Sequence, residues 1–74
     1  MRFKVSVMIE KDDNGYYAWC PDLEGCHSQG DTFEEIVANI KEAIEAYIEA
    51  STPEEREEYR QKEIFTTAIE VEVA

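Results

Sequence analysis

Apolar residues occupy every second position from Phe3 to Ile9, separated by residues that are mostly polar. A period of two is typical of a β-strand with one face against a core. We therefore predict a strand over residues 2–11. The turn signal Asn14-Gly15 comes next, just before a second apolar run. Its position predicts a hairpin whose returning strand covers residues 16–20.

A proline and a glycine bracket the following turn. Pro21 removes a backbone donor and Gly25 relaxes the chain, so residues 21–25 are expected to form a fixed loop. A short third strand over residues 26–29 then completes an antiparallel three-stranded meander. Gly30 ends this strand.

Beyond Gly30 the apolar spacing changes to three and four residues, the period of an amphipathic helix. The apolar positions are Phe33, Ile36, Val37, Ile40, Ile44, Tyr47 and Ile48. Asp31 or Thr32 stands where a helix cap is needed, and an acidic residue follows three positions after each. We predict one main helix over residues 32–50, packed on one face of the sheet.

Two further elements are expected near the C-terminus. Thr52 and Pro53, followed by acidic residues, are typical of a helix start and predict a short polar helix to Lys62, anchored by Tyr59. The alternation then returns, which predicts a fourth strand over residues 65–73. Its alternating positions are Phe65, Thr67, Ile69, Val71 and Val73.

The predicted order of the main elements is βββαβ, which places the chain in the α+β class as a single domain of residues 1–74. A fourth strand beside the first would give the spatial order 3-2-1-4, as in the first part of an RNase H-like fold. Pairing of the fourth strand with the third would contradict this order.

The chain length and the net charge limit the binding partners that can be expected. A chain of 74 residues buries a modest core, so self-association as a homodimer or higher oligomer is expected. The net charge of −11 repels a phosphate backbone, and direct nucleic-acid binding by this chain is not expected. The same charge favours a basic protein partner, although simple solubility explains it equally well.

No stretch approaches the roughly 20 apolar residues of a membrane span, and no signal peptide is recognised, so a cytoplasmic location is expected. Cys20 and Cys26 flank the 21–25 loop and are expected to be reduced, compact core residues. A structural zinc site needs four ligands, and no second cysteine or histidine pair is present. We expect neither metal nor cofactor.

Catalytic chemistry has few candidates. His27 is the only histidine, and on a strand Cys26 and His27 point to opposite faces, which separates nucleophile from base. An acidic-cluster, metal-dependent nuclease is a second, weaker alternative. Its candidate acids are Glu10, Asp12, Asp13, Asp22, Glu24 and Asp31. Because most of these acids stand in turns, where aspartate serves the backbone, we do not expect an enzyme.

Binding fits the residues better. Tyr17 and Trp19 share one face of the second strand, while Tyr16 and Ala18 share the other. With a helix on one face only, one aromatic pair is left as a candidate contact surface. The alternative is that both faces are packed inside the monomer or a dimer.

The connected series of motifs in residues 3–50 resembles the HicB-like antitoxin family. The motifs are Asn14-Gly15-Tyr16-Tyr17-Ala18, Pro21-Asp22-Leu23-Glu24-Gly25-Cys26, Gly30-Asp31-Thr32 and Asn39-Ile40-Lys41-Glu42-Ala43-Ile44. The resemblance implies a partial RNase H-like fold without nuclease activity. It also implies a type II antitoxin that binds a small basic HicA-type ribonuclease toxin and covers its active site.

Many members of that family also carry a C-terminal helix-turn-helix or ribbon-helix-helix segment for operator DNA. Here Ala74 follows directly on the expected fourth strand, so autoregulation through such a segment is not expected. A solitary HicB-like oligomer with no toxin is the main alternative. For the partner surface we select Tyr17, Trp19, Asp22 and Glu24, with the acidic residues 54–58 as a second region.

Overall fold

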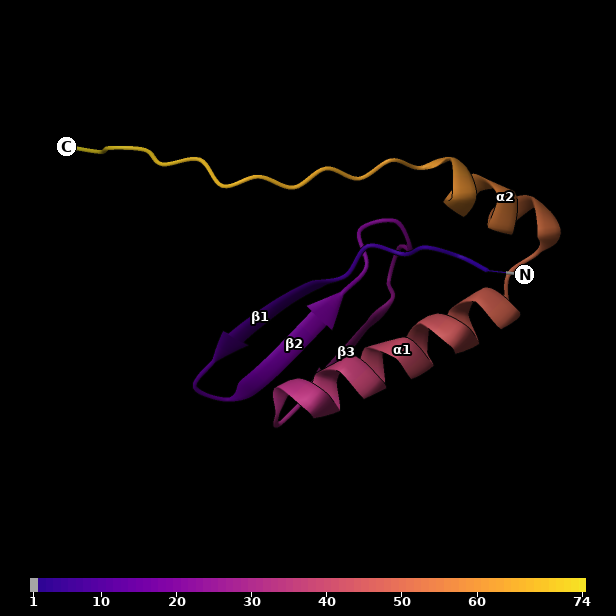
Figure 1. Ribbon diagram of the computed structural model, residues 1–74, viewed down its shortest axis with the longest axis horizontal. Helices are drawn as coiled ribbons and strands as arrows, with labels where there is room; N and C mark the ends of the chain where they lie inside the picture. Colours follow the sequence, from indigo (N-terminus) through magenta and orange to yellow (C-terminus); the bar gives the residue numbers. More distant parts are fainter. Residues whose placement is uncertain (1) are drawn as a thin grey trace.

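The computed structural model describes residues 2–74 and has an α+β architecture, as predicted: a three-stranded antiparallel sheet and two helices (Figure 1). The sheet order is β1-β2-β3. The elements are β1 (Met8–Asp12), β2 (Gly15–Trp19), β3 (His27–Gly30), α1 (Phe33–Glu49) and α2 (Pro53–Gln61).

The β1-β2 hairpin forms where the Asn-Gly signal predicts it. Asp12 pairs with Gly15, which has a φ of +125°. Glycine adopts this backbone conformation at little energetic cost. The Asp12 carboxylate accepts the Asn14 N–H at 2.8 Å, which holds the turn. The predicted hairpin and its antiparallel sense are therefore confirmed.

The loop between β2 and β3 is held by its own backbone. Cys20 N–H donates to the Cys26 carbonyl at 3.1 Å, and Cys26 N–H donates to the Leu23 carbonyl at 3.0 Å. The Leu23 side chain is fully buried. The predicted fixed loop thus carries a core residue at its centre.

Helix α1 begins at a cap and packs on one face of the sheet, as predicted. The Thr32 hydroxyl accepts the Glu35 N–H at 3.1 Å, and the Glu35 carboxylate accepts the Asp31 N–H at 3.1 Å. The helix packs on β3 and β2. A Cβ at Gly30 would lie 2.9 Å from the Ile36 nitrogen, so the small residue here lets α1 approach the sheet closely. The buried core consists of Ala18, Cys20, Leu23, Cys26, Ile36 and Ile40.

Helix α2 is anchored to the C-terminal end of α1. The predicted anchor is confirmed, since the Tyr59 ring lies 5.8 Å from the Tyr47 ring, centroid to centroid. Arg56 adds a second attachment, donating through Nε to the Ile48 carbonyl at 3.0 Å and through Nη2 to the Glu49 carbonyl at 3.3 Å. These are carbonyls at the end of a helix, which need external donors. Within residues 2–74, neither helix is long and apolar enough to cross a membrane.

The two ends of the chain differ from the sequence prediction. Residues 62–74 form no strand, so the spatial order 3-2-1-4 is not observed, and β1 starts at Met8 rather than at residue 2. A strand needs a hydrogen-bonded neighbour, and the described sheet gives these two segments none. The tail extends clear of the domain (Figure 1). The radius of gyration is 14.4 Å, against about 11 Å for a compact chain of this length.

The two cysteines are free and buried side by side in the core. Burial raises the pKa of the Cys20 thiol to about 12, with Cys26 and Asp22 adding to the effect. Burial also raises the pKa of Cys26. Both groups are therefore neutral, compact core residues at neutral pH, and the thiolate needed for nucleophilic reaction is suppressed.

These thiols predict a loss of stability in alkaline solution. The unfolded chain releases both thiol protons near pH 8.5 and the folded chain only at higher pH, so the free energy of unfolding should fall from about pH 8.5 upward, and for Cys20 until its folded pKa of about 12. Each thiol contributes a slope of about 1.4 kcal/mol per pH unit at most. Urea unfolding under reducing conditions measures this, and Cys20→Ser should show a smaller slope, because only the Cys26 thiol then contributes. A flat profile over this range would contradict the prediction.

Candidate functional site

The face of the sheet opposite α1 is open. Because successive side chains of a strand point to opposite faces, the fully buried Ala18 of β2 points toward α1, and its neighbours Tyr17 and Trp19 point away. Across the strands, Tyr17 pairs with Glu10, and Trp19 pairs with His27. The prediction that Tyr17 and Trp19 share a face is confirmed.

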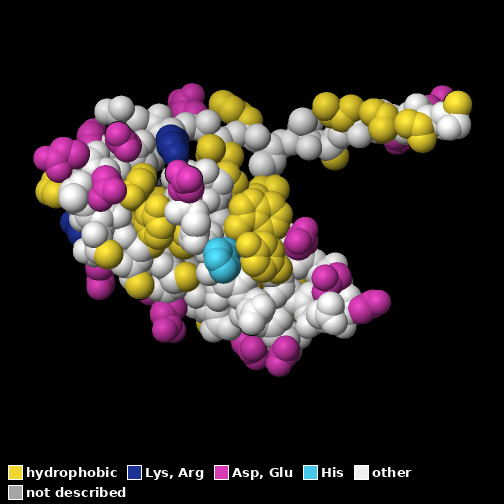
Figure 2. Space-filling view, turned by 180° about the vertical axis from the view of Figure 1, so that it is seen from behind, with side chains coloured by type: hydrophobic (Ala, Val, Ile, Leu, Met, Phe, Trp, Pro, Cys, Tyr) yellow, Lys and Arg dark blue, Asp and Glu magenta, His cyan; other side chains and the backbone are white. Residues whose placement is uncertain are grey.

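Three rings form a row on this open face. The Tyr17 and Trp19 rings stack at a centroid distance of 5.7 Å and an interplanar angle of 28°. Tyr17 also lies 5.7 Å from the His27 ring. Figure 2 shows the histidine beside this apolar surface. Rings that already support one another lose little conformational freedom when a partner covers them.

A shallow depression of about 420 Å³ lies beside these rings. Tyr17 and Trp19 line it, and Gly25 of the β2-β3 loop forms another part of its wall. Glu24 is the exposed residue next to Gly25, and its carbonyl accepts the Tyr47 hydroxyl at 2.8 Å. The structure therefore brings Tyr17 and Trp19 together on the open face, whereas Glu24 lies in the β2-β3 loop with its backbone bonded to α1.

Asp22 is placed differently from the other three selected residues. Its side chain is 4% exposed, and Oδ2 accepts the Ser6 backbone N–H at 3.2 Å. Oδ1 is buried with no hydrogen-bond partner among residues 2–74. The Asp22 carbonyl accepts from Lys62 Nζ at 3.4 Å. Asp22 thus connects the N-terminal segment, the β2-β3 loop and the end of α2.

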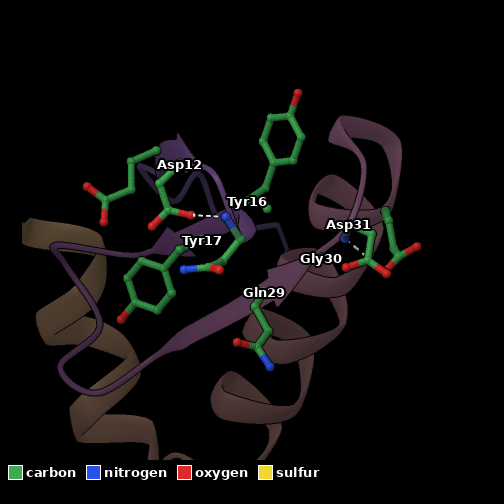
Figure 3. A pocket seen from close by; sticks show the side chains of 10 residues that line it. Asp12, Tyr16, Tyr17, Gln29, Gly30 and Asp31 are labelled. Atoms are coloured by element: carbon green, nitrogen blue, oxygen red, sulfur yellow. Dashed lines mark hydrogen bonds between the residues drawn. The ribbon is translucent and has the colours of Figure 1, made fainter.

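Carboxylates gather at the hairpin end of the sheet (Figure 3). A depression of about 720 Å³ is lined there by Glu10, Asp12, Asp31 and Glu35, with Tyr17 on its wall. Asp12 and Glu35 hold backbone N–H groups of the hairpin turn and of the α1 start. Among residues 2–74, no three histidine, cysteine or acidic side chains are placed to hold a metal ion.

The six acids of the nuclease alternative are divided between two ends of the molecule. Glu10, Asp12 and Asp31 line the hairpin-end depression and Asp13 lies in the β1-β2 turn, whereas Asp22 and Glu24 belong to the β2-β3 loop. His27 is exposed and Cys26 is buried, so these two neighbours point apart. Within residues 2–74 the acids thus form two separate groups, and Cys26 and His27 do not face each other.

The second selected region lies on α2. Glu54, Glu57 and Glu58 are exposed, while Arg56 and Tyr59 are partly buried against α1. Glu55 completes a capping box with Thr52. This helix therefore presents acidic side chains to solvent at the far end of α1.

An apolar groove was missed by sequence reasoning. It holds about 570 Å³ and runs between residues 3–7 and α1, on the β1 side that the helix leaves uncovered. Its apolar walls are Phe3, Val5 and Val7 on one side and Val37, Ile40, Ile44 and Ile48 on the other. The alternation of residues 3–9 predicted a buried row, but only the tertiary structure shows that part of this row lacks a cover.

Comparisons with known proteins identify the family of this chain. The model of the HicB-like antitoxin family of bacterial toxin-antitoxin systems matches residues 5–73. A UPF0150 protein of Synechocystis sp. is 61% identical over 49 residues, which are 65% of this chain and 62% of that protein. A UPF0150 protein of Helicobacter pylori is 57% identical over 44 residues, 60% of this chain and 61% of that protein.

A UPF0150 protein of Archaeoglobus fulgidus is 47% identical over 47 residues, 62% of this chain and 68% of that protein. The chain thus spans a little over six-tenths of the length of the first two relatives. No solved structure gives a significant match. The family match covers nearly the whole chain and agrees with the motifs around the hairpin, the β2-β3 loop and α1, so this chain belongs to the HicB-like antitoxin family.

Proposed function

We propose that this chain is an antitoxin that binds a small, basic, HicA-type ribonuclease toxin and blocks its active site by covering it. The observation that carries the proposal is the open sheet face, where an exposed Tyr17 stacks on a partly buried Trp19 beside carboxylates. Tyrosine and tryptophan are the residue types that most often anchor protein interfaces. In this proposal the chain performs no catalysis.

Charge supports the same partner. The chain carries 18 acidic and 7 basic residues, Glu10 and Asp12 border the aromatic row, and Glu24 is exposed in the β2-β3 loop. A basic toxin is attracted to such a surface, which accelerates encounter and discriminates against acidic proteins. The exposed acids of α2 form a second contact region in this proposal.

The proposal includes a cytoplasmic location, homo-oligomerisation and no direct binding of nucleic acid by this chain. A solitary oligomer without a toxin is the alternative function, favoured by the long exposed tail and the uncovered groove. The proposal also includes the four-stranded, partial RNase H-like arrangement. Residues 65–73 join no sheet in the isolated chain, so the fourth strand of this arrangement is part of the proposal.

The first experiment is affinity purification of the tagged chain from its native cells, with mass spectrometry of what is bound. Recovery of a stoichiometric basic protein of HicA type supports the antitoxin function, provided that the purified pair shows inhibition of RNA cleavage. Recovery of the chain alone as a stable oligomer favours the solitary alternative.

The aromatic pair gives a direct prediction. Tyr17→Ala combined with Trp19→Ala should weaken toxin binding by about 30-fold or more, because a central aromatic anchor pair is worth at least about 2 kcal/mol. Isothermal titration calorimetry measures the affinity, and circular dichroism confirms folding. Phe33→Ala on α1 is the matched control, since this ring is 52% exposed and lies away from the open face. Equal affinities of the double variant and the wild type would refute the assignment.

Asp22 gives a prediction of a different kind. Asp22→Ala removes the acceptor of the Ser6 N–H and should lower the free energy of unfolding by about 1–3 kcal/mol. Asp22→Asn keeps an acceptor oxygen and should lose less. Urea unfolding measures both, and the folded Asp22→Asn variant should bind toxin with unchanged affinity. Normal stability with lost toxin binding would instead make Asp22 a contact residue.

A further inference from the structure

Two segments of the chain have apolar side chains without a cover: the N-terminal segment, residues 2–7, and the tail, residues 65–73. We propose that the tail of one copy pairs as a β-strand with the N-terminal segment of a second copy, and that the exchange is reciprocal. The result is a dimer in which each copy completes the sheet of the other. This inference concerns self-association and holds with or without a toxin partner.

The tail has the pattern of a strand that is missing its sheet. Ile69, Val71 and Val73 are 75–90% exposed, and they alternate with Glu70 and Glu72. Figure 2 shows apolar side chains spaced along the tail where it leaves the body of the molecule. Such an exposed alternating segment gains from a partner that covers one face and pairs its backbone.

The N-terminal segment presents a matching edge. The Ser6 N–H points to Asp22, on the side of the β2-β3 loop. Since backbone groups of successive residues in an extended chain point to opposite edges, those of Val5 and Val7 point to the outer edge. The segment continues directly into β1, whose neighbour in the described sheet is β2. An incoming strand would therefore extend the sheet on this side.

Both faces of the two segments are complementary. On the α1 side, Phe3, Val5 and Val7 line the groove, which the apolar face of the tail would fill. On the opposite side, Arg2 and Lys4 are exposed, and the acidic face of the tail carries Glu70 and Glu72. Opposite charges on neighbouring strands stabilise a pair. One pairing thus satisfies the apolar and the charged face together.

The geometry of α2 favours a second copy as the occupant. Arg56 and Tyr59 hold α2 on α1, and the tail leaves it in a direction that runs clear of its own sheet (Figure 1). Each copy has one tail and one groove, so a two-fold dimer satisfies both pairs and leaves neither segment unpaired. A dimer also supplies the apolar burial that a core of six buried residues lacks.

The oligomeric state tests the proposal. The full chain should have the mass of a dimer by light scattering at micromolar concentration. Ile69→Asp with Val71→Asp should raise the dimer dissociation constant by roughly 100-fold or more. Thr66→Asp with Ala68→Asp adds the same charge on the other face of the tail and should change it only a few-fold. A monomeric wild type would show that the tail pairs within its own chain or not at all, and a dimer insensitive to Ile69 and Val71 would show another interface. Either result overturns the proposal.

A charge-reversal experiment tests which two segments pair. It uses substitutions of exposed residues and leaves the buried core unchanged. Arg2→Glu with Lys4→Glu, and separately Glu70→Lys with Glu72→Lys, should each weaken the homodimer, because like charges then face each other. Mixing the two variants should restore a dimer that contains one copy of each, detected by native mass spectrometry. All four residues are exposed, so both variants should fold. Homodimers as tight as the wild type, or no heterodimer after mixing, would refute the pairing.

Discussion

One helix has to cover a three-stranded sheet, and the rest of the structure follows from this mismatch. A helix with its side chains is about 10 Å wide, while neighbouring strands lie about 4.8 Å apart, so one helix covers about two strands of one face. Gly30 determines which two strands are covered, because it lets the start of α1 approach β3 closely. Helix α1 therefore lies over β3 and β2, and the β1 side stays bare.

Both candidate interaction surfaces arise from this arrangement. The face opposite α1 has no cover, which leaves Tyr17 exposed and Trp19 partly exposed. On the covered face, the strip beside β1 remains an apolar groove lined by residues 3–7. The two surfaces lie on opposite faces of the sheet, so self-association through the groove leaves the aromatic row free for a different partner.

The acidic residues serve two purposes that sequence counting does not separate. Asp12 and Glu35 hold backbone N–H groups at turns and helix starts, and Asp22 is buried as an acceptor for Ser6. Glu24 and the exposed acids of α2 have solvent-facing side chains. The local geometry therefore decides which part of the −11 charge is structural and which part faces a partner.

The sequence by itself determined the local elements. Periodicity and turn chemistry predicted the hairpin, the β2-β3 loop, the capped α1 and the short α2, because these depend on residues close together in the chain. It also placed Tyr17 and Trp19 on one face, since a strand alternates strictly. The family followed from the motifs of residues 3–50.

Only the tertiary structure decided the features that depend on distant residues. It buried Asp22, which stands in a turn by sequence but meets the Ser6 N–H from another segment. It attached Arg56 to the end of α1, and it left residues 65–73 without a strand neighbour despite their alternation. The physical reason is that alternation specifies how a segment can pair, whereas a strand exists only where an open edge lies within hydrogen-bonding distance.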